Sequence, residues 1–210
     1  MATLPFLTKT YHHKSYPAIA PSRPELSTNG SVVLITGAGS GSGKATAYAF
    51  AKADAKAFAL CGRRLAPLEA VKAKIEAKHP SAKAIVLFLE IVSEREVDPV
   101  FTDFCVREGP TDILVNSAGH KSDKGTIAET TLVNCWESLE TTCKKAASSS
   151  HSIPQNHNTS THADPVLISM NGLVAHMLAS QIKTAPASYA SSKMAQGKMI
   201  EYAASKNRGS

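Results

Sequence analysis

A strand, a glycine-rich turn and a helix follow one another without interruption near the start of this chain. The stretch is Ser31–Thr46, with the sequence SVVLITGAGSGSGKAT. Its apolar run at residues 32–35 is typical of a strand that is covered on both faces. The alternating glycines that come next allow the backbone to turn tightly and to approach a diphosphate, and the following helix directs its N-terminal amides at that anion. We therefore predict a nucleotide-binding turn within an α/β fold.

The rest of the chain alternates between segments with strand and helix patterns. We expect strands at 31–36, 56–61, 84–89, 113–115 and 165–170, and helices at 43–53, 65–78, 94–107 and 188–205. Such alternation implies right-handed crossovers and a parallel sheet. The expected fold is a Rossmann-like, doubly wound sheet of about five strands in the order 3-2-1-4-5. It forms a dinucleotide-binding domain at residues 31–210, preceded by an irregular N-terminal arm at residues 1–30.

The spacing of the glycines separates this turn from two common phosphate-binding loops. A G-x-G-x-x-G pattern fails in either register, because Ser42 and Lys44 stand where its third glycine should fall. A Walker A loop fails as well, since Ala38 replaces its first glycine and Ala45 replaces the residue whose hydroxyl would hold magnesium. The pattern that matches is T-G-x-x-x-G-x-G, formed by Thr36, Gly37, Gly41 and Gly43.

Two further motifs follow in order along the chain. The sequence NSAG occupies residues 116–119, and YASSK at residues 189–193 puts a phenol and an ammonium on one face of a predicted helix. Alone, such a tyrosine is more often a packed aromatic ring. In this order and on these elements, the three motifs resemble the short-chain dehydrogenase/reductase family over roughly residues 30–206. The arm sequence YHHKSYP and the strand end GRR at residues 62–64 are similar to fungal members.

The end of the second predicted strand indicates which cofactor the chain prefers. An acidic residue there would bind the ribose hydroxyls of NAD and repel the additional phosphate of NADP. This strand instead ends in Gly62, Arg63 and Arg64. Two guanidinium groups can form charge-assisted bonds with a 2′-phosphate, so we predict NADP(H). The alternative is that Arg63 and Arg64 cap a solvated turn.

The resemblance implies a function and a set of site residues. It implies an NADP(H)-dependent oxidoreductase that interconverts a small-molecule alcohol and a ketone or aldehyde, in secondary-metabolite biosynthesis. Tyr189 would be the general acid/base, and Lys193 would stabilise its phenolate and bind the nicotinamide ribose. Asn116 would close the fourth strand against the cofactor. The full set of implied cofactor-binding residues is Gly37, Ser40, Gly41, Ser42, Gly43, Arg63, Arg64, Asn116, Tyr189 and Lys193.

Several positions depart from the family's pattern. Asn171 or Gly172 stands where the family has a catalytic serine, and Ser169 is a poor substitute because a shift of one residue along a strand reverses the face of the side chain. Thr142 replaces an asparagine that relays protons to the lysine, and Ile91 replaces an aspartate that contacts adenine. The family also continues beyond the equivalent of residue 210, into further strands and a substrate lid. The alternative function is therefore a C-terminally truncated, catalytically impaired relative that binds dinucleotide or a partner chain.

Residues 144–164 are more polar than the family's pattern, which has an apolar helix there that packs on the sheet and on a partner subunit. We expect a polar loop or disordered segment, which would weaken any homo-oligomer. The histidines at 151, 157 and 162 share no helical face and are accompanied by no cysteine or carboxylate pattern, so we expect no metal site.

Composition argues against several other classes of protein. The formal charge is +6, but the basic residues are scattered and no aromatic-interleaved basic patch indicates nucleic-acid binding. No apolar run approaches the length of a membrane span, and no secretion signal is recognisable, so we expect a cytoplasmic protein without membrane contact. The four cysteines show no C-x-x-C spacing and are expected to be buried or partly buried thiols.

Overall fold

The computed structural model of the protein describes residue 12 and residues 15–89, 94–120, 128–157, 165–177 and 187–206. Five strands in this part of the chain form one parallel sheet in the order β3-β2-β1-β4-β5, which confirms the predicted order and fold class. The strands are β1 (Val32–Thr36), β2 (Ala57–Gly62), β3 (Lys83–Phe88), β4 (Ile113–Asn116) and β5 (Val166–Ser169). Each strand end lies within one residue of its predicted position.

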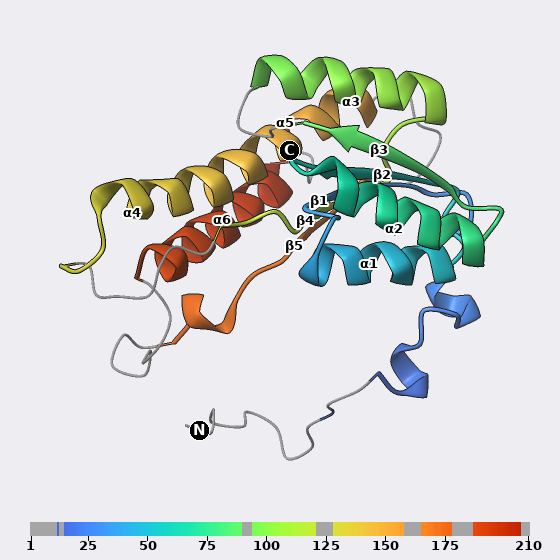
Figure 1. The fold of residues 1–210 in the computed structure, drawn as a ribbon, viewed down its shortest axis with the longest axis horizontal. Coiled ribbons are helices and arrows are strands. Elements are labelled where there is room, and N and C mark those ends of the chain that lie inside the picture. The colour runs from blue at the N-terminus through green and yellow to red at the C-terminus, as the bar shows by residue number, and fades with distance from the viewer. Residues whose placement is uncertain are drawn as a thin grey trace.

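Helices cover both faces of the sheet (Figure 1). The helices α1 (Gly41–Lys52) and α2 (Leu65–Lys78) lie on one face. The opposite face carries α3 (Glu94–Glu108), α5 (Lys145–His157) and α6 (Ala187–Lys206), while α4 (Leu132–Leu139) packs along α6. This is the doubly wound arrangement that the alternation of elements predicts.

The two apolar cores follow the alternation of side chains along the strands. Val33 and Ile35 of β1 point toward α1 and α2, where they join a fully buried cluster. Val32 and Leu34 point the other way, toward Phe101 of α3 and its neighbours. Because both faces of β1 are buried, its continuous apolar run is a direct consequence of its central place in the sheet.

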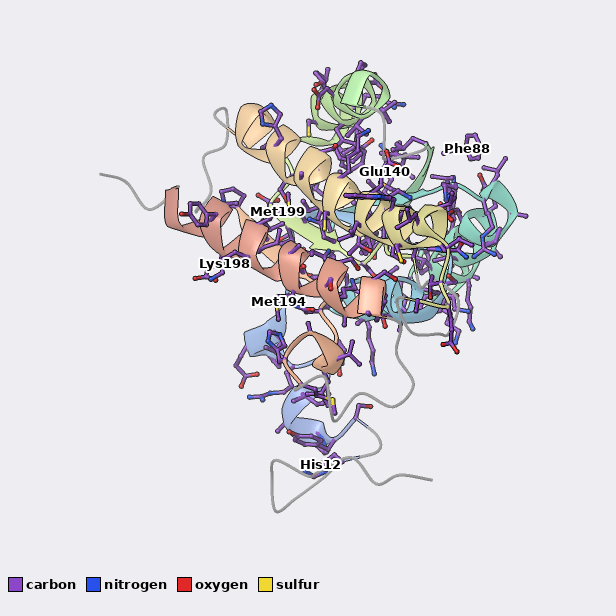
Figure 2. All side chains as sticks on the ribbon, turned by 90° about the vertical axis from the view of Figure 1, so that its left-hand side faces the viewer. His12, Phe88, Glu140, Met194, Lys198 and Met199 are labelled. Atoms are coloured by element: carbon purple, nitrogen blue, oxygen red, sulfur yellow. The ribbon has the colours of Figure 1, made fainter. Side chains whose placement is uncertain are left out.

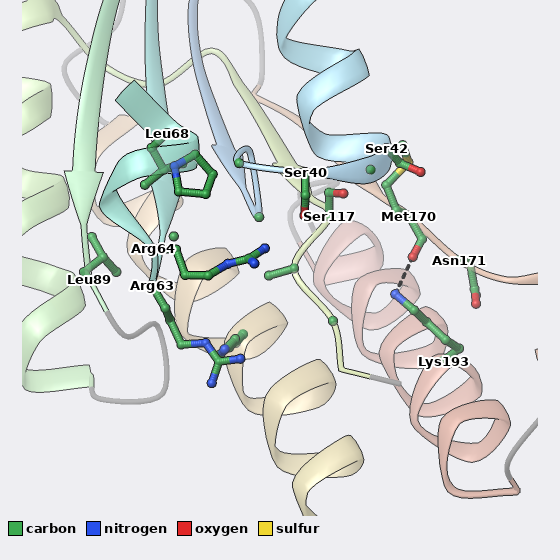
Figure 3. A pocket seen from close by; sticks show the side chains of 18 of the residues that line it. Ser40, Ser42, Arg63, Arg64, Leu68, Leu89, Ser117, Met170, Asn171 and Lys193 are labelled. Atoms are coloured by element: carbon green, nitrogen blue, oxygen red, sulfur yellow. Dashed lines mark hydrogen bonds between the residues drawn. The ribbon is translucent and has the colours of Figure 1, made fainter. Parts of the chain in front are cut away.

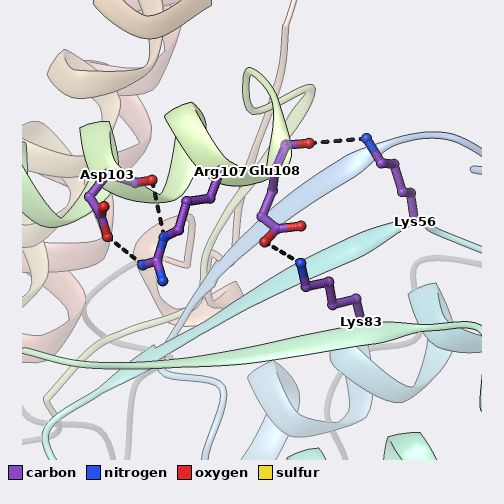
Figure 4. A network of polar contacts seen from close by, with 5 residues as sticks. All are labelled: Lys56, Lys83, Asp103, Arg107 and Glu108. Carbon is purple, nitrogen blue, oxygen red and sulfur yellow. Dashed lines mark hydrogen bonds and ion pairs between the residues drawn. The ribbon is translucent and has the colours of Figure 1, made fainter.

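A polar network attaches the end of α3 to the sheet (Figure 4). Glu108, whose side chain is almost fully buried, accepts an ion pair from Lys83 Nζ of β3 at 2.6 Å. Its backbone carbonyl accepts a bond from Lys56 Nζ at 3.1 Å, next to β2. Arg107 pairs with Asp103 one turn earlier on α3. These contacts lie where the strands begin, far from the ends that carry the glycine-rich turn.

A continuous helical run extends from Leu132 to His157 and lies beside α6 (Figure 2). Between α4 and α5 this run contains a π-helical turn, η3 (Glu140–Lys144). A π turn accommodates an additional residue relative to an α-helical turn, and such turns are frequent at functional sites. On the outer side of α4, Leu132, Val133 and Trp136 are exposed.

The structure contradicts the expected polar loop over residues 145–157, which form α5. The helix is compatible with its polar sequence in part because the hydroxyls of two of its serines are bonded where α5 meets β4. Ser149, which is fully buried, donates to its own helix at Lys145 O and lies 2.6 Å from Asn116 Oδ1 of β4. Ser150 Oγ accepts from Asn116 Nδ2 at 3.1 Å. Residues 158–164 lie outside the described part of the chain.

The end of the N-terminal arm is attached to the domain by a backbone bond from Thr28 N to Ala53 O at 2.8 Å. Before this point the arm forms two 3-10 turns, η1 (Pro17–Ile19) and η2 (Pro24–Leu26). All four cysteines are free and are buried or half-buried, as predicted. Within the described residues, no helix combines the length and the apolar character needed to cross a membrane.

Candidate active site

A pocket of about 340 Å³ lies at the carboxyl ends of the strands (Figure 3). It is located at β1, which has β2 on one side and β4 on the other. From β1 the strands are added first toward β3 and then toward β5, so the direction of the strand order reverses here. This is the switch point at which open α/β sheets bind ligands. Eight of the ten predicted site residues line it, namely Gly37, Ser40, Gly41, Ser42, Arg63, Arg64, Tyr189 and Lys193.

The glycine-rich turn forms one wall of the pocket and has the backbone geometry that only glycine adopts without strain. Gly37 has φ +69°, and a Cβ there would lie 2.9 Å from the Ala118 backbone. Gly41 has φ +52°, and a Cβ there would contact nothing within 4 Å. The main chain at Gly41 is therefore open to a ligand, at the N-terminus of α1.

Gly43 and Asn116 do not line the pocket. Gly43 lies under the turn, where a Cβ would come within 2.4 Å of Gly37 O, so it permits close packing of α1 against the strand end. The Asn116 side chain is turned toward α5, and both ends of its amide are bonded there. Asn116 contributes to the pocket only through the backbone, because it ends β4 and the next residue, Ser117, lines the wall.

Basic side chains from several elements line the pocket. Arg63 and Arg64 follow β2 and lie on the side opposite Lys193 (Figure 3). Lys145 also lines the pocket, because the segment predicted to be a loop is instead the helix α5, which begins at this residue. No aspartate or glutamate is among the lining residues that the structure describes. The pocket is therefore suited to an anionic ligand.

Tyr189 and Lys193 lie one turn apart on α6 and both face the pocket. The Lys193 ammonium donates to Met170 O at 2.7 Å and to Gln196 Oε1 at 2.8 Å. Burial lowers the pKa of Lys193, and the nearby Cys143 opposes this shift. Burial also raises the pKa of Cys143, against a smaller opposite effect of Lys193. A backbone carbonyl and a buried amide oxygen thus hold the ammonium in place at the wall of the pocket.

The structure distinguishes between Asn171 and Gly172, which the sequence left open. A Cβ at Gly172 would lie 3.8 Å from the Tyr189 hydroxyl, so this residue faces the phenol. Asn171 also lines the pocket, but its side chain is bonded elsewhere, since Oδ1 accepts from Gly172 N at 2.8 Å and Nδ2 lies close to Gly197 of α6. Ser169 Oγ is buried, has no hydrogen-bond partner among the described residues and does not line the pocket.

Comparison with known proteins decides the family. The family profile for short chain dehydrogenases matches residues 31–208. The chain belongs to the short-chain dehydrogenase family. A curated relative, the short chain dehydrogenase/reductase nsrO of Aspergillus novofumigatus, is 27% identical over 121 residues. The match covers 57% of this chain and 40% of the relative, so it spans less than half of the relative's length.

Solved short-chain dehydrogenases share the fold. An alcohol dehydrogenase from Thermococcus sibiricus, complexed with 5-hydroxy-NADP, superimposes with a TM-score of 0.73 at 19% identity, covering 84% of this chain and 71% of that one. A 3-oxoacyl-[acyl-carrier protein] reductase from Brucella melitensis with bound NAD gives a TM-score of 0.75 at 16% identity, covering 92% and 70%. At such identities the likeness shows the fold alone.

Two of the departures from the short-chain dehydrogenase pattern can be located next to Lys193 and Tyr189. Thr142, in the π turn, is fully buried, and its Oγ1 has no hydrogen-bond partner among the described residues. A Cβ at Gly119 would lie 3.8 Å from Thr142 Oγ1 and 3.5 Å from Lys193 Nζ, so both atoms border the same point. Gly172 is the other departure.

Ile91 lies outside the described residues. The described residues contain no cluster of His, Cys, Asp or Glu side chains able to hold a metal.

Proposed function

We propose that the chain is an NADP(H)-dependent oxidoreductase that interconverts a small-molecule alcohol and a ketone or aldehyde. The observation that carries this proposal is the convergence of three separate groups on one pocket. The glycine-rich turn, the two arginines after β2 and the Tyr189–Lys193 pair lie far apart in the sequence but line the same space. Membership of the short-chain dehydrogenase family supports the reaction class.

The residues of the pocket fit a dinucleotide phosphate. Gly41 leaves its main chain open to the pocket at the start of α1, where backbone N–H groups suit a diphosphate. Arg63 and Arg64 supply guanidinium groups, and the neighbouring Gly62 supplies no carboxylate that would repel a 2′-phosphate. When bound, NADP(H) would donate or accept the hydride.

The chain's own residues would handle the proton. The Tyr189 hydroxyl would donate to the carbonyl oxygen during reduction and accept from the alcohol during oxidation. Lys193 would supply a positive charge at the same wall of the pocket, held in place by Met170 O and Gln196 Oε1. Tyr189 is half-buried at the wall of the pocket, so its hydroxyl can contact a substrate bound there.

The cofactor preference is tested by titrating the protein with NADPH and NADH, with binding followed by cofactor fluorescence. A hydrogen bond to a charged group contributes about 1.5–3 kcal/mol. We therefore expect NADPH to bind about tenfold or more tightly than NADH. The Arg63→Ala/Arg64→Ala double variant should lose this difference, whereas Lys198→Ala, an exposed lysine on α6, should keep it. Equal affinities in the unaltered protein would mean that the arginines do not contact a 2′-phosphate.

The role of Tyr189 is tested by Tyr189→Phe, which removes only the hydroxyl. We expect carbonyl reduction to fall below detection, because the proton donor is lost, while NADPH affinity stays within about twofold. The assay is NADPH oxidation with a panel of small ketones and quinones. Reduction by the phenylalanine variant at the parental rate would contradict the assignment.

A second candidate function is dinucleotide binding with little turnover. It is favoured by Gly172, which faces the tyrosine hydroxyl without a hydroxyl of its own. One donor to the developing oxyanion is then absent, and such donors are worth on the order of 3 kcal/mol. For either candidate, a role in secondary metabolism is proposed from the resemblance of the arm sequence YHHKSYP and the strand end GRR to fungal members of the family. Turnover separates the two, since ordinary enzymes reach roughly 1 per second or faster.

A further inference from the structure

Lys193 lies in a buried setting that Gln196 helps to form. Both residues are on α6, three positions apart, so their side chains share one face of the helix. Lys193 is 4% exposed and Gln196 is fully buried. Lys193 Nζ lies 2.8 Å from Gln196 Oε1 and 2.7 Å from Met170 O, at the end of β5 (Figure 3 shows the second bond).

A buried glutamine is costly at this position. An amide taken out of water loses hydrogen bonds with the solvent, and each of its groups that stays unbonded in the core is destabilising. Gln196 Oε1 is bonded to Lys193, but Nε2 has no hydrogen-bond partner among the described residues. A leucine or methionine would fill a similar volume without an unpaired N–H. The one polar contact that sets glutamine apart from these side chains is the bond to the lysine.

The number of donors on the ammonium limits what Lys193 can still bind. An ammonium carries three N–H groups and no acceptor. Two of them are used by Met170 O, which is backbone, and by the amide of Gln196, which is enclosed in the core. Because both acceptors are fixed, the direction of the third N–H is fixed as well. Lys193 lines the pocket, and on that side a Cβ at Gly119 would lie 3.5 Å from Nζ.

We propose that Gln196 is a positioning residue, which holds the Lys193 ammonium charged and oriented so that one N–H remains for the pocket. This rests on the proposed function, in which the remaining N–H faces Tyr189 and a bound dinucleotide. Gln196 itself does not line the pocket and touches no reacting atom. Its contribution is the fixed acceptor.

The direct readout is the pKa of Lys193, which requires neither cofactor nor turnover. It is measured in the full chain by NMR titration of isotope-labelled lysine, with the signal assigned by its loss in Lys193→Arg. Gln196→Leu removes the acceptor and should lower the pKa of Lys193 by about one unit or more. Gln196→Glu keeps an acceptor oxygen and adds a negative charge, so it should raise this pKa. Met194→Glu adds the same charge on the exposed side of α6 and should shift it far less.

An unchanged pKa of Lys193 in Gln196→Leu would overturn the proposal. If the leucine variant does not fold, Gln196→Glu decides, and a pKa no higher than in the Met194→Glu control would overturn the proposal equally. A merely structural glutamine would give a loss of stability in these variants without the opposite shifts in pKa.

The same samples distinguish this proposal from the proposed function. If the shifts in pKa occur but the unaltered protein binds neither NADPH nor NADH, the proposed function fails and the positioning role stands. If NADPH binds and Tyr189→Phe abolishes turnover while the pKa of Lys193 does not respond to Gln196, the positioning role alone fails.

Discussion

The glycine that faces Tyr189 offers a gain-of-function experiment. Gly172 has an extended backbone, with φ −121° and ψ 142°, which any residue adopts. A Cβ there would lie 3.5 Å from Val174 Cγ2 and 3.8 Å from the Tyr189 hydroxyl, both ordinary contacts. Gly172→Ser therefore adds a hydroxyl beside the phenol without displacing backbone, and it reduces the freedom of the unfolded chain rather than straining the folded one.

The expected size of the effect follows from what one oxyanion donor contributes. Removing such a donor costs about a hundredfold or more in rate, or roughly 3 kcal/mol, so adding one in the correct place should recover a gain of that order. We expect Gly172→Ser to reduce small ketones with NADPH faster than the unaltered chain does, by a factor of about a hundred. NADPH affinity should change little, because position 172 is beside the phenol and not beside the glycine-rich turn.

Two controls make this result interpretable. Gly172→Ala adds the Cβ without the hydroxyl and should show no gain in rate. The Gly172→Ser/Tyr189→Phe double variant should lose the gain, since the added serine would act with the tyrosine on the same oxygen. The reasoning is refuted if alanine accelerates the reaction as much as serine does, or if serine gives no gain although NADPH still binds.

Two further predictions concern stability. Gly43→Ala places a Cβ 2.4 Å from the Gly37 carbonyl, so we expect the free energy of unfolding by urea to fall by about 1–3 kcal/mol. The control Gly62→Ala, whose Cβ would have its nearest contact at 3.6 Å, should be about as stable as the parent. Equal stabilities of the two variants would show that α1 can shift. Burial lowers the pKa of Lys193 in the folded chain below its ordinary value of 10.5, which the unfolded chain keeps. At a pH between the folded and the unfolded pKa, the unfolded chain therefore binds a proton that the folded chain has released. The stability of the parent relative to Lys193→Met should therefore rise with pH across this window, and a flat or falling difference would contradict the burial of the charge.

The sheet could be predicted from the sequence because each strand carries its own signal. Val32 to Ile35 form an apolar run, and a run of this kind before a glycine-rich turn indicates a central strand irrespective of the rest of the chain. Right-handed crossovers limit the possible strand orders, and the doubly wound pattern that the glycine-rich turn indicates selects 3-2-1-4-5 among them. The structure confirms this order.

The helix α5 could not be predicted, since its stability depends on a contact distant in sequence. Ser149 is tolerated in the core because Asn116, 33 positions earlier, lies opposite its hydroxyl. Composition treats a serine-rich segment as solvated and carries no information on such a contact. The same error concealed Lys145 as a pocket residue.

The candidate site was predictable where a motif specifies backbone position, and less so where side-chain direction matters. Gly37, Arg63 and Tyr189 reach the pocket because they follow strand ends or lie on a helix face. Asn116 is itself the last residue of β4, but its side chain turns to α5. The choice between Asn171 and Gly172 depends on direction alone. Gln196 was overlooked, although its spacing of three from Lys193 on a predicted helix could have indicated the contact.

The π-helical turn between α4 and α5 separates the length of this segment from the orientation of α5. Within the turn, Thr142 borders Lys193, and after it Ser149 meets Asn116. A one-residue deletion in a regular α-helix would rotate everything after it by about 100°. A π turn already holds one additional residue, so deleting a single residue from Glu140–Lys144 would leave an ordinary α-helical turn and keep Ser149 opposite Asn116. The loss would fall on the turn itself, and so on the contact between Thr142 and Lys193.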